Sequence, residues 1–202
     1  MRRNEFEVTD EDTIKKVLAE CEYGTLSLIA NGEPYGVALN FVLHKGNICF
    51  HGAQEGRKVD AIKTNPYASF LAVRPYSVIP SYFSNTRAAC PATHFFASVH
   101  VYGKMSIVKN LNEKAEVLEA MMQKLQSEGG YDTIRADNPI YTKMLEETGV
   151  YILTPKKISL KIKAGQNLPD ERKSIIIQKL MHRDKDGDKS TLQLMLSLDD
   201  EN

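Results

Sequence analysis

The chain has 202 residues, and its 26 basic and 26 acidic side chains give a formal net charge of zero. Hydrophobic residues make up 42% and charged residues 26%, which is typical of one globular domain with a sizeable core. The zero net charge argues against a nucleic-acid or anionic-membrane partner. No apolar run approaches the roughly 20 residues of a membrane helix. The charged N-terminus predicts no secretory signal, so we expect a cytoplasmic protein.

The first predicted elements are a short helix and an antiparallel meander. Thr9 precedes three acidic residues, which predicts a helix that Thr9 caps and Gly24 ends. Alternating apolar residues, interrupted by turns rich in Gly and Asn, then predict strands over 25–30, 35–43 and 48–51. Links this short leave no room for the crossover helices of a parallel sheet.

The rest of the chain mixes both periods, which predicts an α+β protein that is mainly β. We expect a small antiparallel barrel decorated by helices. The further predicted strands cover 68–73, 95–108, 150–153 and 158–162, and the further predicted helices cover 58–65, 111–125, 139–147 and 169–181.

Two segments show no clear period. Residues 74–93 hold three prolines and predict a long loop, which in a compact domain is either functional or disordered. In this loop Tyr82, Phe83 and Arg87 are candidates to line a substrate pocket, with an ordinary surface loop as the alternative. Near the C-terminus, the three aspartates of residues 184–188 fail the spacing of a calcium loop and predict a solvated turn, so we expect no metal site.

The segment with the clearest chemistry is Phe50–Pro66, FHGAQEGRKVDAIKTNP. It leaves a predicted strand, passes two glycines and presents Arg57 and Lys58 at the start of a predicted helix. A helix N-terminus aims free amide groups at an anion, and the adjacent Arg and Lys add positive charge. The segment therefore predicts a phosphate site, although it matches neither a Walker loop nor GxGxxG. The alternative is that both cations are solvated side chains.

Four motifs occur in an order that carries a family resemblance: YGVALNF at 35–41, FHGAQEGRK at 50–58, KTNP at 63–66 and SVHVYGK at 98–104. The sequence resembles the pyridoxamine 5'-phosphate oxidase-like split β-barrel flavoproteins. Its opening MRR, its long loop and its GQNLP are most similar to the branch related to nitroimidazole-resistance (Nim) proteins. The resemblance covers roughly residues 1–168.

The resemblance implies a six- to seven-stranded antiparallel split β-barrel over residues 1–168, followed by a C-terminal helix and polar tail over 169–202. It also implies a homodimer with FMN bound at the subunit interface. Arg57 and Lys58 match the positions that hold the FMN phosphate. The other matched cofactor positions lie on two strands beside the flavin and at one polar position, often supplied by the partner subunit: Leu39, Asn40 and Phe41; His51, Gly52 and Ala53; and Ser98.

One departure from the family narrows the expected activity. True pyridoxamine phosphate oxidases carry C-terminal basic residues that recognise the substrate phosphate. The segment ISLKIKAGQNLP at 158–169 offers no clear counterpart, so we do not expect vitamin B6 oxidation.

The histidines and cysteines offer few catalytic groups. His51 is the one candidate for a catalytic role beside the flavin, and His44 is expected to be exposed in a turn. His94 and His100 bracket a strand and are either ordinary sheet residues or haem ligands. Three scattered cysteines predict no disulfide framework or zinc site. Cys49 is expected to be buried and inert, and Cys90, in the long loop, to be the one reactive thiol, although nothing beside it lowers its pKa.

These observations predict an FMN-dependent oxidoreductase that reduces a small, electron-poor acceptor such as a nitroaromatic. FAD is an alternative cofactor if the cleft is open beyond the phosphate. A second hypothesis is a non-catalytic protein that stores, senses or carries flavin or haem. Haem degradation is a third hypothesis, which would require a haem-binding histidine.

Overall fold

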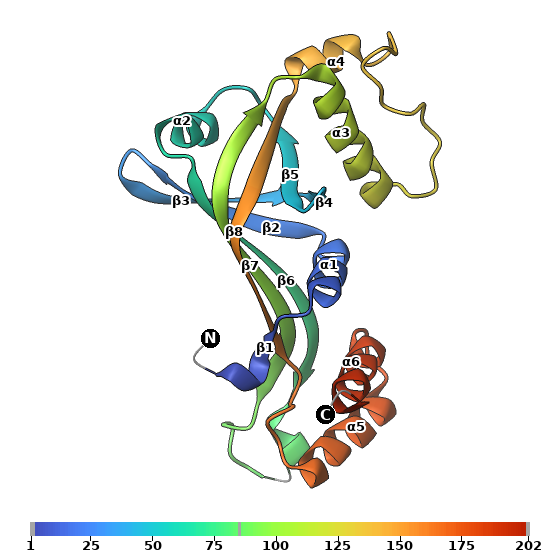
Figure 1. The fold of residues 1–202 in the computed structure, drawn as a ribbon. Coiled ribbons are helices and arrows are strands. Elements are labelled where there is room, and N and C mark those ends of the chain that lie inside the picture. The colour runs from blue at the N-terminus through green and yellow to red at the C-terminus, as the bar shows by residue number, and fades with distance from the viewer. Residues whose placement is uncertain (1–2, 85, 201–202) are drawn as a thin grey trace. The chain divides into compact units, whose positions relative to one another are not determined.

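The computed structural model describes residues 3–84 and 86–200, which form an α+β fold around one antiparallel sheet (Figure 1). Across these residues the sheet has eight strands, whereas six or seven were predicted. The strands are β1 (Glu7–Val8), β2 (Tyr23–Ala30), β3 (Glu33–Asn40), β4 (Val42–His44), β5 (Asn47–Gly52), β6 (Tyr67–Ile79), β7 (Thr93–Val108) and β8 (Gly149–Lys163). Their order is β3-β2-β6-β7-β8-β5-β4, with β1 paired to β8. This order is an open path and not a ring, so the fold is a split barrel.

Four of the helices in the described residues lie between strands along the chain, and the last two follow the final strand. They are α1 (Glu11–Glu20), α2 (Arg57–Thr64), α3 (Leu111–Leu125), α4 (Thr142–Glu147), α5 (Asp170–Arg183) and α6 (Asp188–Asp200), with 3-10 turns η1 (Asn4–Phe6) and η2 (Ser81–Ser84). Within the described ranges, none of the helices is long and apolar enough to cross a membrane.

The chain divides into two compact units, each packed around its own residues. The first unit holds Met1–Ile14, Val73–Ser98 and Ser159–Asn202, and the second holds Lys15–Ala72 and Val99–Ile158. Strands β6, β7 and β8 each contribute residues to both units.

In the second unit, buried and exposed residues alternate strictly along β2. Leu26, Leu28 and Ala30 are buried, and the residues between them are exposed. Gly24 is required in the same strand, because a Cβ atom there would lie 2.0 Å from Cζ of Phe70. The strand pairs with β3 along its whole length, from Tyr23↔Asn40 to Ala30↔Glu33. One face of β2 therefore faces the core, and the other faces outward.

Helix α3 covers β4 and β5 and packs against α4 (Figure 1). The cluster between them includes Cys49 and Leu145, which are fully buried. The buried Lys114 of α3 donates hydrogen bonds from Nζ to the carbonyl oxygens of Leu145 and Thr148, both at 2.7 Å. Lys114 thus satisfies two carbonyl groups at the end of α4 that the helix itself leaves without partners.

The first unit contains the helical hairpin of α5 and α6, which lie side by side (Figure 1). A buried polar cluster joins this hairpin to β6. The Asp188 carboxylate accepts hydrogen bonds from the Ser77 hydroxyl at 2.5 Å and from Nε of Arg183 at 2.8 Å. The backbone N–H of Ser77 donates to the Thr191 hydroxyl at 2.9 Å. Chiefly because of the hydrogen bond from Arg183, the pKa of Asp188 falls from 3.8 to about 2.

Most predicted elements are confirmed, with α3 at its predicted bounds and α2 shifted by one residue. The predicted cap of the first helix was wrong. The Thr13 backbone N–H donates to Oδ2 of Asp10 at 2.7 Å, so Asp10 and not Thr9 caps α1. The helix ends at Glu20, and Gly24 belongs to β2. The predicted strand at 35–43 is divided, because the chain leaves the sheet at the buried Phe41.

Two predictions about irregular segments were also wrong. The long loop predicted from residue 74 begins later, because β6 continues to Ile79, with Ser77 and Ile79 buried. The solvated turn predicted at 184–188 holds for its first residues only. Asp188 is 1% exposed and begins α6, a helix that the polar sequence before it concealed.

Candidate functional site

The predicted phosphate segment connects the end of β5 to the start of α2. Gly56 has a φ angle of 101°, which favours glycine, and it turns the chain into the helix. No side chain caps α2. The first backbone amides of a helix have no acceptor inside it, so this N-terminus favours an anion. We call the surface formed by His51, Gly52, Gly56, Arg57 and Lys58 the phosphate corner.

Lys58 is the most unusual cation of the phosphate corner. Its side chain is half-buried, and Nζ lies 5.3 Å from the ring centroid of Phe50 and 4.8 Å from that of Tyr151. A Cβ atom on Gly52 would lie 2.5 Å from this Nζ, so glycine leaves the space that the ammonium group uses. Burial lowers the pKa of Lys58. In the described part of the chain no carboxylate pairs with it, which leaves a partly desolvated cation in need of an anion.

Arg57 is more exposed and only loosely held. Its guanidinium lies 4.6 Å from the ring centroid of Tyr35, and Nη2 is 3.5 Å from Oε2 of Glu33. Both charged side chains of this ion pair are at least half exposed, so the pair contributes little and can yield to a phosphate.

His51 lies at the edge of the phosphate corner, with Nδ1 at 3.5 Å from Sδ of Met121. A thioether only accepts hydrogen bonds, so the contact fits a ring that carries its proton on Nδ1. Partial burial, and secondly the charge of Lys58, lower the pKa of His51 and favour the neutral ring. Nearby, the Tyr151 hydroxyl donates to the carbonyl oxygen of Ala53 at 2.5 Å and fixes the turn after β5.

The remaining predicted site residues do not all gather at this corner. Leu39 and Asn40 are half-buried at the end of β3, and Nδ2 of Asn40 donates to the carbonyl oxygen of Glu22 at 3.2 Å. Phe41 is 1% exposed, so only its backbone could meet a ligand. Ser98 is half-buried on β7 and belongs to the first unit, whereas the other predicted residues belong to the second.

A hollow of about 430 Å³ lies on the outer face of β2, β3, β6 and β7 in the second unit. Three tyrosines, Tyr35, Tyr67 and Tyr102, form much of its wall, and we call it the tyrosine hollow. Because Arg57 lies over the ring of Tyr35, Tyr35 borders both the phosphate corner and the hollow. The sequence analysis placed Tyr35 and Tyr102 in two of its four motifs, but no sequence pattern singled out Tyr67 or brought the three rings together.

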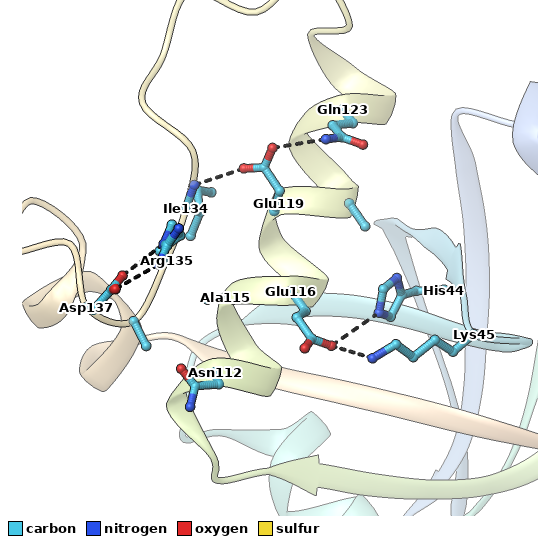
Figure 2. Close-up of a pocket in the computed structure, with 12 residues that line it drawn as sticks. His44, Lys45, Asn112, Ala115, Glu116, Glu119, Gln123, Ile134, Arg135 and Asp137 are labelled. Carbon is cyan, nitrogen blue, oxygen red and sulfur yellow. Dashed lines mark hydrogen bonds and ion pairs between the residues drawn. The ribbon is translucent and has the colours of Figure 1, made fainter.

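A larger groove of about 900 Å³ lies between α3, the segment 134–137 and the turn after β4 (Figure 2). Its charged groups already have partners. Nζ of Lys45 lies 2.5 Å from Glu116, and Nη2 of Arg135 lies 2.8 Å from Asp137. Glu119 accepts the backbone N–H of Ile134 at 2.9 Å. The groove is larger than the tyrosine hollow, but its cations Lys45 and Arg135 are each paired with a carboxylate, whereas in the described residues Lys58 of the phosphate corner is not.

The other histidines are placed as follows. The prediction for His44 was wrong: it is half-buried, with Nε2 at 3.8 Å from Oε2 of Glu116. His94 and His100 are exposed on β7. Their Nε2 atoms lie 2.9 Å from the Tyr76 carbonyl oxygen and 3.2 Å from the Ser69 hydroxyl, respectively.

The prediction that Cys49 is buried is confirmed. Cys49 is fully buried, and burial raises its pKa to about 12, so it is inert. Cys90 is exposed. In the same segment, Phe83 is buried beneath the cations of the α5–α6 hairpin, while Tyr82 is 64% exposed. In residues 3–84 and 86–200 no group of three His, Cys, Asp or Glu side chains could hold a metal ion.

Several solved structures share this fold. A 5-nitroimidazole antibiotic resistance protein from Bacteroides thetaiotaomicron matches with a TM-score of 0.62 and 15% identity, over 77% of this chain and 86% of its own. The flavocytochrome Anf3 from Azotobacter vinelandii matches with a TM-score of 0.66 and 21% identity, over 84% of this chain and 74% of its own. An FAD and heme binding protein from Mycobacterium smegmatis matches with a TM-score of 0.64 and 16% identity, over 78% of this chain and 73% of its own. At these identities the likeness concerns the fold alone.

No curated protein sequence matches the chain. A family model does: the model described as pyridoxamine 5'-phosphate oxidase matches residues 10–162, well over half of the sequence. This range includes the phosphate corner, the tyrosine hollow and strands β2 to β7 in full. The chain therefore belongs to the pyridoxamine 5'-phosphate oxidase family.

Proposed function

We propose that this protein binds FMN and acts as an oxidoreductase that reduces a small, electron-poor acceptor such as a nitroaromatic. The observation that carries the proposal is Lys58: a half-buried ammonium group with no carboxylate partner in the described residues, at the uncapped N-terminus of α2. Family membership supports a flavin as the phosphate-bearing group. The structural neighbours named for flavin, haem and nitroimidazole resistance agree with it.

The residues present fit the phosphate end of FMN. Lys58 supplies a point charge, Arg57 a fork of N–H donors, and the first turn of α2 backbone N–H groups. The backbones of residues 39–41 and 51–53 are the proposed neighbours of the flavin ring. Ser98 belongs to the other unit and keeps only the role that the family resemblance implies. Bound there, FMN would supply two-electron transfer from a donor such as a reduced nicotinamide to the acceptor. A nitro group that takes up two electrons and two protons becomes a nitroso group and water.

A homodimer is part of the proposal. The outward face of the second unit's sheet leaves Tyr23 60% and Leu71 40% exposed. Apolar side chains repeated along one sheet face are commonly covered by a partner, and a second copy would complete a cofactor cleft at this face.

The first experiment is the absorption spectrum of the purified protein, followed by FMN titration of variants. Lys58→Met and Arg57→Ala should each weaken FMN binding about 10- to 100-fold, the worth of a charge-assisted contact to phosphate. Lys63→Ala is the matched control, because Lys63 is an exposed cation in the last turn of the same helix. Unchanged FMN affinity in both variants would remove the assignment.

Other results would support the alternatives. Release of FAD would change the cofactor and keep the phosphate corner. A Soret band would favour haem binding, and His94 and His100, both exposed on β7, would then be the residues to mutate. Oxidation of a reduced nicotinamide that depends on a nitroaromatic acceptor would exclude a non-catalytic binding protein. Light scattering of the loaded protein would test the dimer.

A further inference from the structure

The tyrosine hollow has the size and lining of a small-molecule site. Its volume of about 430 Å³ lies in the range of ligand pockets, roughly 300–1,000 Å³. Ile29 and Pro34 give it apolar surface, while Ser69 and Asn65 add hydrogen-bonding groups. Ligand sites commonly combine such a surface with a few polar groups that fix orientation.

The wall of the hollow is suited to a flat aromatic ring. Tyr67 and Tyr102 lie nearly parallel, with an interplanar angle of 13° and centroids 6.1 Å apart. They remain 42% and 41% exposed, so much of their ring surface is uncovered. Tyr35 supplies a third, half-buried ring. Aromatic rings favour offset or edge contacts with another ring, which this arrangement offers to a planar guest.

The charges around the hollow favour an anion. Nζ of Lys156 donates a hydrogen bond to Oη of Tyr67 at 3.2 Å and lies 4.5 Å from its ring centroid. The hydrogen bond from Lys156 lowers the pKa of Tyr67. Among the residues that the structure describes, Lys156 has no carboxylate partner, and no acidic side chain lines the hollow.

Resting on the proposed function, we propose that the tyrosine hollow binds the electron acceptor as a planar aromatic anion, with Lys156 as the residue that selects negative charge. Tyr67 and Tyr102 provide the aromatic surface. Because Tyr35 borders both the hollow and Arg57, an acceptor in the hollow adjoins the phosphate corner. Aromatic acids should therefore be preferred over neutral aromatics of the same shape.

The test compares 4-nitrobenzoate with 4-nitrobenzamide, which has the same ring and nitro group without the charge. Their dissociation constants for the FMN-loaded protein are measured by ligand-observed NMR, and FMN affinity is measured in parallel. The wild type should bind the benzoate about tenfold more tightly. Lys156→Met should abolish that preference and leave FMN affinity unchanged. Lys157→Met removes the neighbouring exposed lysine of β8 as the matched control and should keep the preference.

Tyr102→Leu removes the aromatic surface and should weaken both ligands several-fold without changing their ratio. An unchanged benzoate preference in Lys156→Met would overturn the inference while FMN binding still stood. Loss of FMN affinity in Lys156→Met or Tyr102→Leu would overturn it by placing the flavin ring in the hollow. If Lys156→Met or Tyr102→Leu lost the dimer but bound both ligands as the wild type does, the inference would be overturned, because the hollow would then be a subunit contact. If the wild type binds no FMN, the proposed function falls first, and the inference with it.

Discussion

Asp188→Asn should destabilise the protein by about 3 kcal/mol at neutral pH. Asp188 is 1% exposed, and the fall of its pKa from 3.8 to about 2 corresponds to about 2.5 kcal/mol in favour of the ionised folded form. The substitution also leaves Arg183, whose side chain is 16% exposed, without its anion, which adds to the cost. Urea unfolding followed by circular dichroism measures the difference between variant and wild type.

The pH dependence separates charge from packing. A folded-state pKa below the ordinary value stabilises the protein above about pH 4, and this contribution is lost as the pH falls from 3.8 through about 2. The difference in the free energy of unfolding between wild type and Asp188→Asn should therefore be constant from pH 7 to pH 5 and be smaller by about 2 kcal/mol at pH 2. Asp137→Asn is the control, because it breaks an exposed ion pair and should leave the unfolding midpoint nearly unchanged.

A difference in unfolding free energy that stays the same from pH 7 to pH 2 would refute this reasoning. The stability lost in the variant would then come from packing and not from the ionised carboxylate. An Asp188→Asn variant as stable as the wild type would show that the polar cluster does not hold α6 on β6.

Three further predictions concern the second unit and the thiols. Lys114→Met should cost about 2–4 kcal/mol, because two carbonyl groups at the end of α4 lose their donor, while the exposed Lys143→Met should not move the urea midpoint. Gly103→Ala should lower the melting temperature by several degrees, because its Cβ would lie 2.1 Å from a backbone oxygen of β8; an unchanged temperature would contradict this close approach. A thiol reagent should label Cys90 at once and Cys49 only after unfolding, as followed by mass spectrometry; early labelling of Cys49 would show that its strand opens.

The sequence was sufficient for the elements whose signal is local. A strand was predicted over 95–108, and β7 runs from Thr93 to Val108, with Phe95, Ala97, Val99 and Val101 buried on one face. The 3.6-residue period of α3 was equally plain. The phosphate corner could also be predicted, because Gly56, Arg57 and Lys58 are consecutive in the chain and a helix follows them directly. The predicted roles of these residues toward FMN remain for the titrations to test.

The tertiary structure decided what depends on residues far apart in the sequence. No local pattern pairs Ser77 with Asp188, 111 positions later. Their hydrogen bond nevertheless joins the end of β6 to the first residue of α6, and both residues are buried. The tyrosine hollow likewise draws one ring each from β3, β6 and β7. Periodicity reports which face of a strand is apolar, because side chains alternate along the backbone. It does not report which strands lie next to each other, and that pairing decides which exposed rings share a surface and which cation lacks an anion.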